Sequence, residues 1–312
     1  TITIGSVKFK VIEKKVSWYV DETYIKVSGK WCYLYRAIDP NSNLVDCRLS
    51  DKRKFGVATK FFINVRRTME SIIVIFGLSG LIFHLFCRYQ INAIPRLDEL
   101  VSPPLSTYPK LSIIIPACDE SDTVESAMRK LLKLNYPSYE IIAVNDRSRD
   151  HTGTILDDLA EEFSQLQVIH IETLPSGWLG KLNALNIGTQ CANGELLLYA
   201  DADVHFEPDF MKRVVAHFEN DQLDYLTLFP EITAQSSMLR GLIFLFASFF
   251  CARLQPKAIN KGRQGMYAGV GVFQLLRRSF FGKTEGWNWL RLEIADDTGL
   301  AYLCHRHGAC AR

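Results

Sequence analysis

The chain has 312 residues, of which 48% are hydrophobic and 22% charged, so it is long enough to bury a full core in one large domain or two smaller ones. Its formal net charge is only +2, which argues against a surface built for nucleic acid or for an acidic partner. Its eight cysteines form no C-x-x-C pair and no cysteine-histidine cluster at zinc spacing, which argues against a disulfide framework or a structural zinc and favours a reduced, cytosol-facing chain.

Residues 1–62 predict a short β-meander. The stretch 16–50 alternates β-branched and aromatic residues, which is typical of strands. Two groups of turn-forming residues interrupt it, Ser28-Gly29 and the run DPNSN at 39–43. We therefore expect three strands joined by hairpin turns.

The segment 71–87 carries no formal charge and is flanked by Arg66, Arg67 and Arg88. At roughly 1.5 Å per residue, a helix of this length barely crosses a hydrocarbon core of about 30 Å. We expect an anchor helix over 69–90 that spans the membrane or dips into it, and a buried helix of a soluble protein is the alternative. Basic residues on both sides leave its orientation open under the positive-inside rule.

Residues 91–110 are rich in proline and polar residues, which is typical of a linker. From residue 111 onward, apolar runs typical of buried parallel strands alternate with amphipathic helical segments. The expected strands lie within 111–120, 139–146, 167–172 and 195–203. Strands and helices in this order form βαβ units, so we expect an α/β domain with a mostly parallel sheet and flanking helices over 111–312.

Acidic residues follow the ends of these strands, at Asp119, Glu120, Asp146, Asp201 and Asp203. The carboxyl ends of parallel strands meet at one edge of the sheet, where ligands bind, so these carboxylates would repel one another without a cation. A hard divalent ion, Mg²⁺ or Mn²⁺, that itself bridges a diphosphate is the natural compensation. If the strand stays extended through Ala202, Asp201 and Asp203 point to the same side. The alternative is an Asp-rich turn in which Asp201 caps a loop.

Six motifs in the chain occur in the same order in one enzyme family. They are IIIPACDE, VNDRSRDHT, GWLGKLNALNIG, ADADVHFEPDF, GVGVFQLLRRSFF and EIADDTGLAYLCHRHG. On these motifs the run from about Met69 to Arg312 resembles a family 2 glycosyltransferase with a GT-A (Rossmann-like) fold, of the membrane branch that includes hopanoid-associated and ceramide glucosyltransferase-like enzymes. The resemblance implies an inverting transfer of a sugar from a nucleotide-diphosphate donor, in most cases a UDP-sugar, to a hydroxyl group of a lipid or glycan acceptor.

The resemblance also implies roles for individual residues. It places Asp119 or Glu120 and Asp146 at the nucleoside, and Lys181 near the diphosphate. It makes Asp201 and Asp203 the D-x-D site, with Asp203 the direct metal ligand. It makes Asp297 the base that removes the acceptor proton, with Asp296 beside it in the same motif. Transfer of a sugar requires these two elements, a stabilised diphosphate and a nearby base.

The resemblance further implies an enzyme at the inner or plasma membrane of a bacterium, with its catalytic domain in the cytoplasm. Relatives of this membrane type continue into a Q/R-x-x-R-W motif and further membrane helices, which this chain does not contain. The chain also begins at Thr1 rather than at a methionine. We therefore expect a piece of a longer protein, with a catalytic domain truncated at its C-terminus and activity lowered or lost.

The N-terminal part, over about 8–62, resembles the opening of the catalytic domain of insertion-sequence DDE transposases, which share a ribonuclease H-like fold. The motif VDETYIKV carries Asp21 at the position of the first acidic residue. These enzymes need three carboxylates to hold two metal ions, and the pattern stops before the second and third. We interpret this part as a truncated transposase-like fragment and do not expect DNA as a partner. The alternative is a transposase remnant, fused to a glycosyltransferase, that binds DNA or has no activity.

Two further features each have two interpretations. The segment 241–254 has an apolar run of about 11 residues, too short to span a membrane, so it either lies in the membrane interface and presents a lipid acceptor or forms a core helix. Trp287 and Trp289 precede the expected base. They either form the floor of an acceptor site or pack in the interior.

Overall fold

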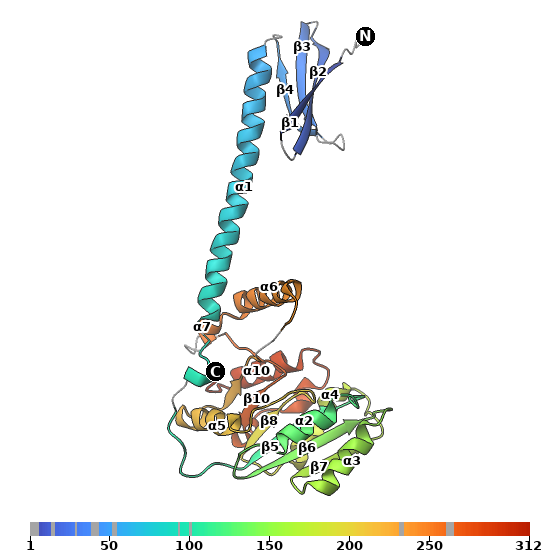
Figure 1. Cartoon of the computed structure of the whole chain (residues 1–312), viewed down its shortest axis with the longest axis vertical. Coiled ribbons are helices and arrows are strands. Elements are labelled where there is room, and N and C mark those ends of the chain that lie inside the picture. Colours follow the sequence, from blue (N-terminus) through green and yellow to red (C-terminus); the bar gives the residue numbers. More distant parts are fainter. Residues whose placement is uncertain are drawn as a thin grey trace. The chain divides into compact units, whose positions relative to one another are not determined.

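The computed structural model describes residues 6–13, 16–28, 30–38, 44–51, 55–92, 94–99, 102–230, 234–259 and 265–312. The chain divides into two compact units, Thr1–His84 and Leu85–Arg312. Figure 1 shows the elements of each unit in the colours of the sequence.

The first unit contains an antiparallel sheet in the order β1-β2-β3-β4. Its strands are β1 Ser6–Glu13, β2 Val16–Val27, β3 Lys30–Ile38 and β4 Leu44–Ser50. The meander therefore has four strands rather than three, because the residues before the alternating stretch add β1. Ser28 adopts a left-handed φ of 49° between β2 and β3, as the Ser-Gly turn requires. The second expected turn, at 39–43, lies outside the described residues.

A single helix, α1 Phe55–Ile91, follows the sheet and is 37 residues long. It begins well before the expected anchor at residue 69 and includes the end of the expected meander. No proline interrupts its sequence, so nothing stops the helix between the sheet and the apolar segment. Its part Val74–Ile91 is long and apolar enough to cross a membrane, and only 11% of that stretch is buried.

The second unit is built on a six-stranded sheet in the order β7-β6-β5-β8-β10-β9. Its strands are β5 Leu111–Ala117, β6 Tyr139–Asp146, β7 Leu166–Ile171, β8 Leu196–Tyr199, β9 Tyr225–Thr227 and β10 Gln274–Arg277. The first four in spatial order are parallel, and β10 pairs antiparallel with both of its neighbours. The expected mostly parallel α/β sheet is confirmed. The strand order reverses between β5 and β8, which is where open α/β sheets bind ligands.

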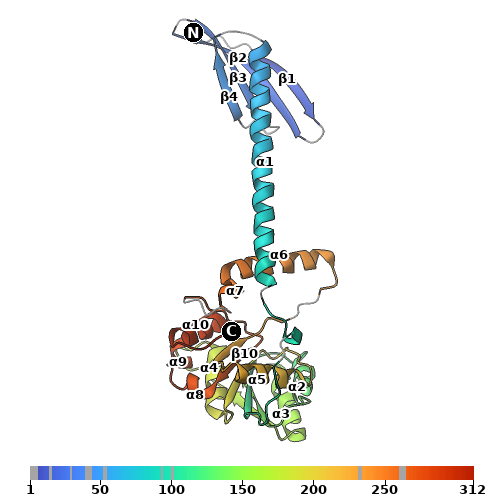
Figure 2. The ribbon, with the colours of Figure 1, turned by 90° about the vertical axis from the view of Figure 1, so that its left-hand side faces the viewer.

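Helices cover both faces of this sheet (Figures 1 and 2). One face carries α2 Val124–Leu131, α3 Thr152–Glu162 and α5 Phe210–Asn220, and the other α4 Gly180–Cys191, α9 Trp287–Leu290 and α10 Asp296–Arg306. Alternate residues of β5 serve opposite layers, since Ile113 packs in the first core cluster and Ile114 in the second. Burial on both faces explains the continuous apolar run in the sequence.

The loop after β8 departs from the extended conformation considered above. The strand ends at Tyr199, and Ala202 and Asp203 lie in a turn. Ala202 is buried and Asp203 is exposed, but the strand has ended before them, so strand alternation does not determine the relative directions of Asp201 and Asp203. The turn positions both carboxylates beyond the carboxyl end of β8.

The linker before β5 contains a short 3₁₀ helix, Leu97–Glu99, and later in the chain α8 Arg278–Phe281 follows β10. Within the linker, Leu105 and Tyr108 pack against the first core cluster, and the Pro103 carbonyl accepts a hydrogen bond of 3.0 Å from Asn220 Nδ2. These contacts attach much of the linker to the domain.

The apolar segment near residue 241 forms α6 Ser237–Leu254, followed by α7 Pro256–Ile259. The stretch Ser237–Ile259 is long and apolar enough to cross a membrane, so the expectation that it is too short was wrong. Figure 2 shows α6 outside the two helical layers, and only Ser248 and Cys251 of this helix are buried. The core-helix interpretation is therefore wrong as well.

Candidate active site

An open cleft of about 760 Å³ lies at the carboxyl ends of β5, β6 and β7. Asp119 lines it, in a left-handed conformation with φ of 57°. Its Oδ1 accepts a hydrogen bond of 2.7 Å from the Arg149 amide, and its own amide donates to Ser148 Oγ at 3.0 Å. The loops after β5 and β6 are therefore tied together across the mouth of the cleft.

Glu120, the other candidate for the nucleoside, is turned toward the start of α2. Its Oε2 accepts a hydrogen bond of 2.9 Å from Thr123 Oγ1, and its amide donates to Thr152 Oγ1 at 2.8 Å. Glu120 is absent from the lining of the cleft among the residues the structure describes. Of the two candidates, the geometry favours Asp119.

Asp146 ends β6 at the base of the same cleft and is only 4% exposed. Arg147 binds both of its carboxylate oxygens, with Nε 2.8 Å from Oδ1 and Nη2 3.0 Å from Oδ2. Gly180 packs directly against this pair, because a Cβ at that position would lie 2.3 Å from Asp146 Oδ2. The glycine at the start of α4 is thus required for close approach to the buried carboxylate.

Arg147 and His170 are cleft residues that sequence reasoning missed. Arg147 has a left-handed φ of 58°, which turns its side chain back onto the residue before it. His170 lies on β7 between Asn145 and Asp157, with Nδ1 3.0 Å from Asn145 Nδ2 and Nε2 2.9 Å from Asp157 Oδ1. Arg147 lies in the motif VNDRSRDHT and His170 lies in none of the six motifs, and no spacing rule in the sequence indicates the partners of either residue.

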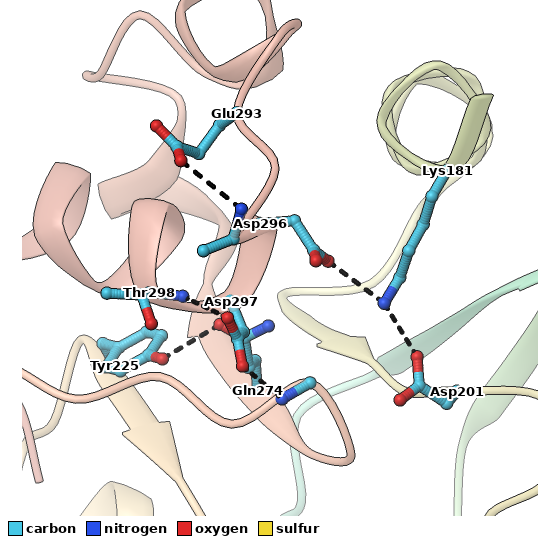
Figure 3. Close-up of polar contacts among 10 residues, drawn as sticks. Lys181, Asp201, Tyr225, Gln274, Glu293, Asp296, Asp297 and Thr298 are labelled. Atoms are coloured by element: carbon cyan, nitrogen blue, oxygen red, sulfur yellow. Dashed lines mark hydrogen bonds and ion pairs between the residues drawn. The ribbon is translucent and has the colours of Figure 1, made fainter. Parts of the chain in front are cut away.

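The diphosphate end of the expected site is organised by Lys181. Figure 3 shows its ammonium group between two carboxylates, with Nζ 2.9 Å from Asp201 Oδ1 and 3.1 Å from Asp296 Oδ2. These three side chains come from α4, the loop after β8 and the start of α10. Burial lowers the pKa of Lys181, but Asp296 and Asp201 outweigh it, so the pKa of Lys181 is raised and the group stays charged.

Asp203 and the second oxygen of Asp201 are the oxygen atoms suited to a hard metal ion. Asp203 is exposed, and within the described part of the chain its carboxylate makes no hydrogen bond or ion pair. A Cβ at Gly271 would lie 3.4 Å from Asp201 Oδ2, so the glycine leaves this oxygen accessible. No group of three metal-binding side chains occurs among the described residues. One or two carboxylates with phosphate oxygens and water fit Mg²⁺ or Mn²⁺.

Asp296 and Asp297 begin α10 but have different partners. Asp296 faces Lys181, as described above, with a side chain that is 18% exposed. Asp297 accepts a hydrogen bond of 2.6 Å from the Thr298 amide (Figure 3). It also accepts one of 3.2 Å from the Gly271 amide. Gly271 thus lies beside Asp201, Lys181 and Asp297 together.

The two tryptophans before α10 have different environments. Trp287 is 2% exposed, and its Nε1 donates to Thr189 Oγ1 at 2.9 Å, so the interior interpretation is correct for it. Trp289 is 42% exposed, and the Arg306 guanidinium lies 5.5 Å from its ring centroid. Only Trp289 of this pair is accessible to an acceptor.

Comparisons with known proteins agree with the motifs. A family model described as glycosyl transferase family 2 matches residues 112–284. A second family model, described as a DDE domain, matches residues 15–74, in agreement with the transposase resemblance of the first unit. The two matches do not overlap.

Curated relatives are glycosyltransferases. Beta-monoglucosyldiacylglycerol synthase of Synechocystis is 28% identical over 219 residues, which are 66% of this chain and 44% of the relative. Poly-beta-1,6-N-acetyl-D-glucosamine synthase of Staphylococcus aureus is 30% identical over 240 residues, 75% of this chain and 54% of the relative. The chain spans about half the length of the curated relatives it matches.

Among solved structures, a mannosyltransferase from Pyrobaculum calidifontis in complex with GDP-Man and Mn²⁺ is similar. It has a TM-score of 0.51 and 18% identity, and the likeness covers 73% of this chain and 61% of that protein. At this identity the likeness concerns the fold, and it agrees with the expected GT-A fold.

Proposed function

Because this chain belongs to glycosyl transferase family 2, we propose that it transfers a sugar from a nucleoside-diphosphate donor to a hydroxyl group of an acceptor. The observation that carries the proposal is the cluster of Lys181, Asp201 and Asp296 beyond β8, on the same edge of the sheet as the open cleft beyond β5, β6 and β7. The cleft takes the nucleoside, and the cluster takes the charged diphosphate and the reacting centre. This arrangement matches the requirement for stabilising a departing diphosphate.

We assign the nucleoside to Asp119 and Asp146, which line the cleft. The donor that we propose is a uridine diphosphate sugar, as the resemblance implies. Arg147 neutralises Asp146, so the nucleobase of a bound donor would contact an ion pair rather than an isolated carboxylate. Arg149 and His170 complete the walls of the cleft.

Lys181 stabilises the negative charge that develops on the leaving diphosphate, because its raised pKa keeps it protonated. A divalent ion, Mg²⁺ or Mn²⁺, held by Asp203 and Asp201 would supply further electrostatic stabilisation of the diphosphate. The similar mannosyltransferase carries GDP-Man together with Mn²⁺, which supports this cofactor.

Asp297 is the base that we propose for the acceptor hydroxyl. Its position against the Gly271 amide places it beside Asp201 and Lys181. It removes the hydroxyl proton as the acceptor oxygen attacks the anomeric carbon, and the bond from that carbon to the diphosphate oxygen breaks in the same step. A single displacement inverts the anomeric configuration. Asp296, the residue before this base, forms an ion pair of 3.1 Å with Lys181.

The acceptor that we propose is a lipid or a glycan at a membrane. One relative is named as a glucosyldiacylglycerol synthase and another as a synthase of poly-N-acetylglucosamine, which support these two classes. The exposed apolar helices α1 and α6 support association with a membrane. We propose a bacterial inner or plasma membrane, with the catalytic unit on its cytoplasmic side.

For the first unit the second candidate function is DNA binding by a transposase fragment, which the DDE domain match favours. Strand transfer requires three carboxylates, and the motif supplies only Asp21. Affinity for inverted-repeat DNA that falls steeply with salt would support this candidate. Equal binding to any DNA, or none, would dismiss it.

Binding of UDP to the full chain, measured by calorimetry with and without Mn²⁺, tests the proposed function. We expect Mn²⁺-dependent binding that Asp203→Ala weakens about tenfold or more, since charged contacts of this kind contribute about 1.5–3 kcal/mol. Asp209→Ala is a matched control, because Asp209 lies beyond the same loop and its Oδ1 contacts Asn135 instead. Unchanged affinity in Asp203→Ala would contradict the proposal.

A further inference from the structure

Lys181 occupies the space between the donor side and the acceptor side of the site. Its Nζ lies 2.9 Å from Asp201 Oδ1 and 3.1 Å from Asp296 Oδ2, so one ammonium group neutralises two carboxylates (Figure 3). The Lys181 side chain is 41% exposed, so it is able to leave this position without opening the core.

Asp201, one of these two carboxylates, is also proposed as part of the metal site. A divalent ion on Asp201 would lie within a few ångströms of the Lys181 ammonium, and two cations at that separation repel each other strongly. The ammonium and a free metal ion therefore compete for Asp201. A diphosphate changes the balance, because its oxygens bind both cations at once.

Space for this exchange lies at Gly271. A Cβ at that position would be in van der Waals contact with both groups, 3.4 Å from Asp201 Oδ2 and 3.8 Å from Lys181 Nζ, so it would occupy the space beside them. With glycine there, a diphosphate is able to approach Asp201 and Lys181 from the same side. The Gly271 amide also contacts Asp297, which links this space to the proposed base.

We propose that Lys181 is an internal counter-ion that takes the place of the divalent metal while no donor is bound. It holds Asp201 and Asp296 together, opposes the binding of a free metal ion, and moves onto the diphosphate when the metal arrives with the donor. Metal and nucleotide therefore bind cooperatively. This inference rests on the proposed function, since it assumes the same donor and metal.

The test compares two binding measurements on the full chain in detergent micelles. Binding of Mn²⁺ alone is measured from the electron paramagnetic resonance signal of the free ion, and binding of UDP is measured calorimetrically with Mn²⁺ present. For Lys181→Met we expect affinity for Mn²⁺ alone to rise about three- to tenfold and affinity for UDP with Mn²⁺ to fall about tenfold. A purely structural role for the lysine would not move the two affinities in opposite directions.

Three further variants complete the design. Lys181→Gln serves as a second neutral variant in case the methionine disturbs folding, with the same expected changes. Lys181→Arg keeps the charge and should bind Mn²⁺ alone within about twofold of the unmodified chain, as a charge-based effect requires. Lys110→Met is the matched control, because Lys110 also forms a lysine-carboxylate pair, with Glu140 at 2.8 Å, and lies next to the opposite end of β5.

The outcomes separate the two proposals. Opposite changes in both neutral variants, with Lys110→Met unchanged, support the inference. If the unmodified chain binds UDP with Mn²⁺ but the neutral variants bind Mn²⁺ alone no more tightly, the inference is wrong and the proposed function stands. If the unmodified chain fails to bind UDP with Mn²⁺, the proposed function fails and the inference with it.

Discussion

The two ends of the candidate site neutralise their carboxylates in different ways. At the nucleoside end, Asp146 is paired with Arg147, the next residue in the chain, through both of its oxygens. At the diphosphate end, Asp201 is paired through one oxygen with Lys181, which comes from another element, and Asp203 has no partner within the described residues. The first pair is fixed by local backbone, whereas the second joins separate elements. The fixed pair suits the nucleoside end to recognition of the shape of the nucleoside. The pair between separate elements suits the diphosphate end to the exchange of one cation, Lys181, for another, the metal ion.

The largest effect on turnover should come from a substitution outside both pairs, Asp146–Arg147 and Asp201–Lys181. Asp297→Asn removes the proposed base while keeping its size, so we expect turnover to fall at least about 100-fold with UDP affinity little changed. Initial rates of sugar transfer and calorimetric UDP binding measure the two effects separately. A parallel loss of UDP affinity would mean that Asp297 serves the donor site instead.

The fixed pair is tested by Arg147→Gln, which leaves a buried carboxylate without its cation. We expect UDP affinity to fall about tenfold, and the free energy of unfolding to fall by about 1–3 kcal/mol, because a charged hydrogen-bond partner is lost. Calorimetry and denaturant unfolding measure these changes. Arg129→Gln is the control, since Arg129 pairs with Glu125 and Glu162 at an exposed surface. An equal effect in both variants would show that Arg147 has no special role.

The smallest expected effect on UDP affinity concerns Gly180, which packs against the pair of Asp146 and Arg147. Gly180→Ala would place a Cβ 2.3 Å from Asp146 Oδ2, so the pair must shift. We expect a loss of about 1–3 kcal/mol in stability and a modest loss of UDP affinity. Gly241→Ala in α6 meets no atom within 4 Å and should be neutral or slightly stabilising. If Gly180→Ala behaves like this control in thermal unfolding, the fixed pair is more adaptable than its geometry indicates.

Much of this arrangement follows from the sequence, because strand ends and chain order place Asp119, Asp146 and Asp201 on one edge of the sheet. Other parts depend on torsion angles that no pattern reports. A residue following Asp146 in an extended strand would point to the opposite face, and only the left-handed φ of Arg147 returns its side chain. The sequence predicts an anchor helix over 69–90 because only the apolar segment stands out, whereas α1 already begins at Phe55, among residues assigned to the meander.

The neighbouring residues Asp296 and Asp297 illustrate a second limit. Successive residues of a helix point about 100° apart, so which of the two faces Lys181 depends on the entry angle of α10. Gly269, which is distant in the sequence, allows the close approach of the start of α10, since a Cβ at Gly269 would lie 1.9 Å from the Asp297 carbonyl oxygen. Sequence spacing alone does not contain this information.

The backbone at Asp119 also restricts how the nucleoside cleft is able to diversify. A left-handed φ is readily accepted by glycine, asparagine and aspartate, and poorly by β-branched residues. Exchange among those three changes the charge at the mouth of the cleft, while the tie between Asp119 and the Arg149 amide preserves the loop only where a side-chain acceptor remains. A change in which nucleobase the cleft prefers is therefore reached most easily by exchanging aspartate for asparagine at residue 119.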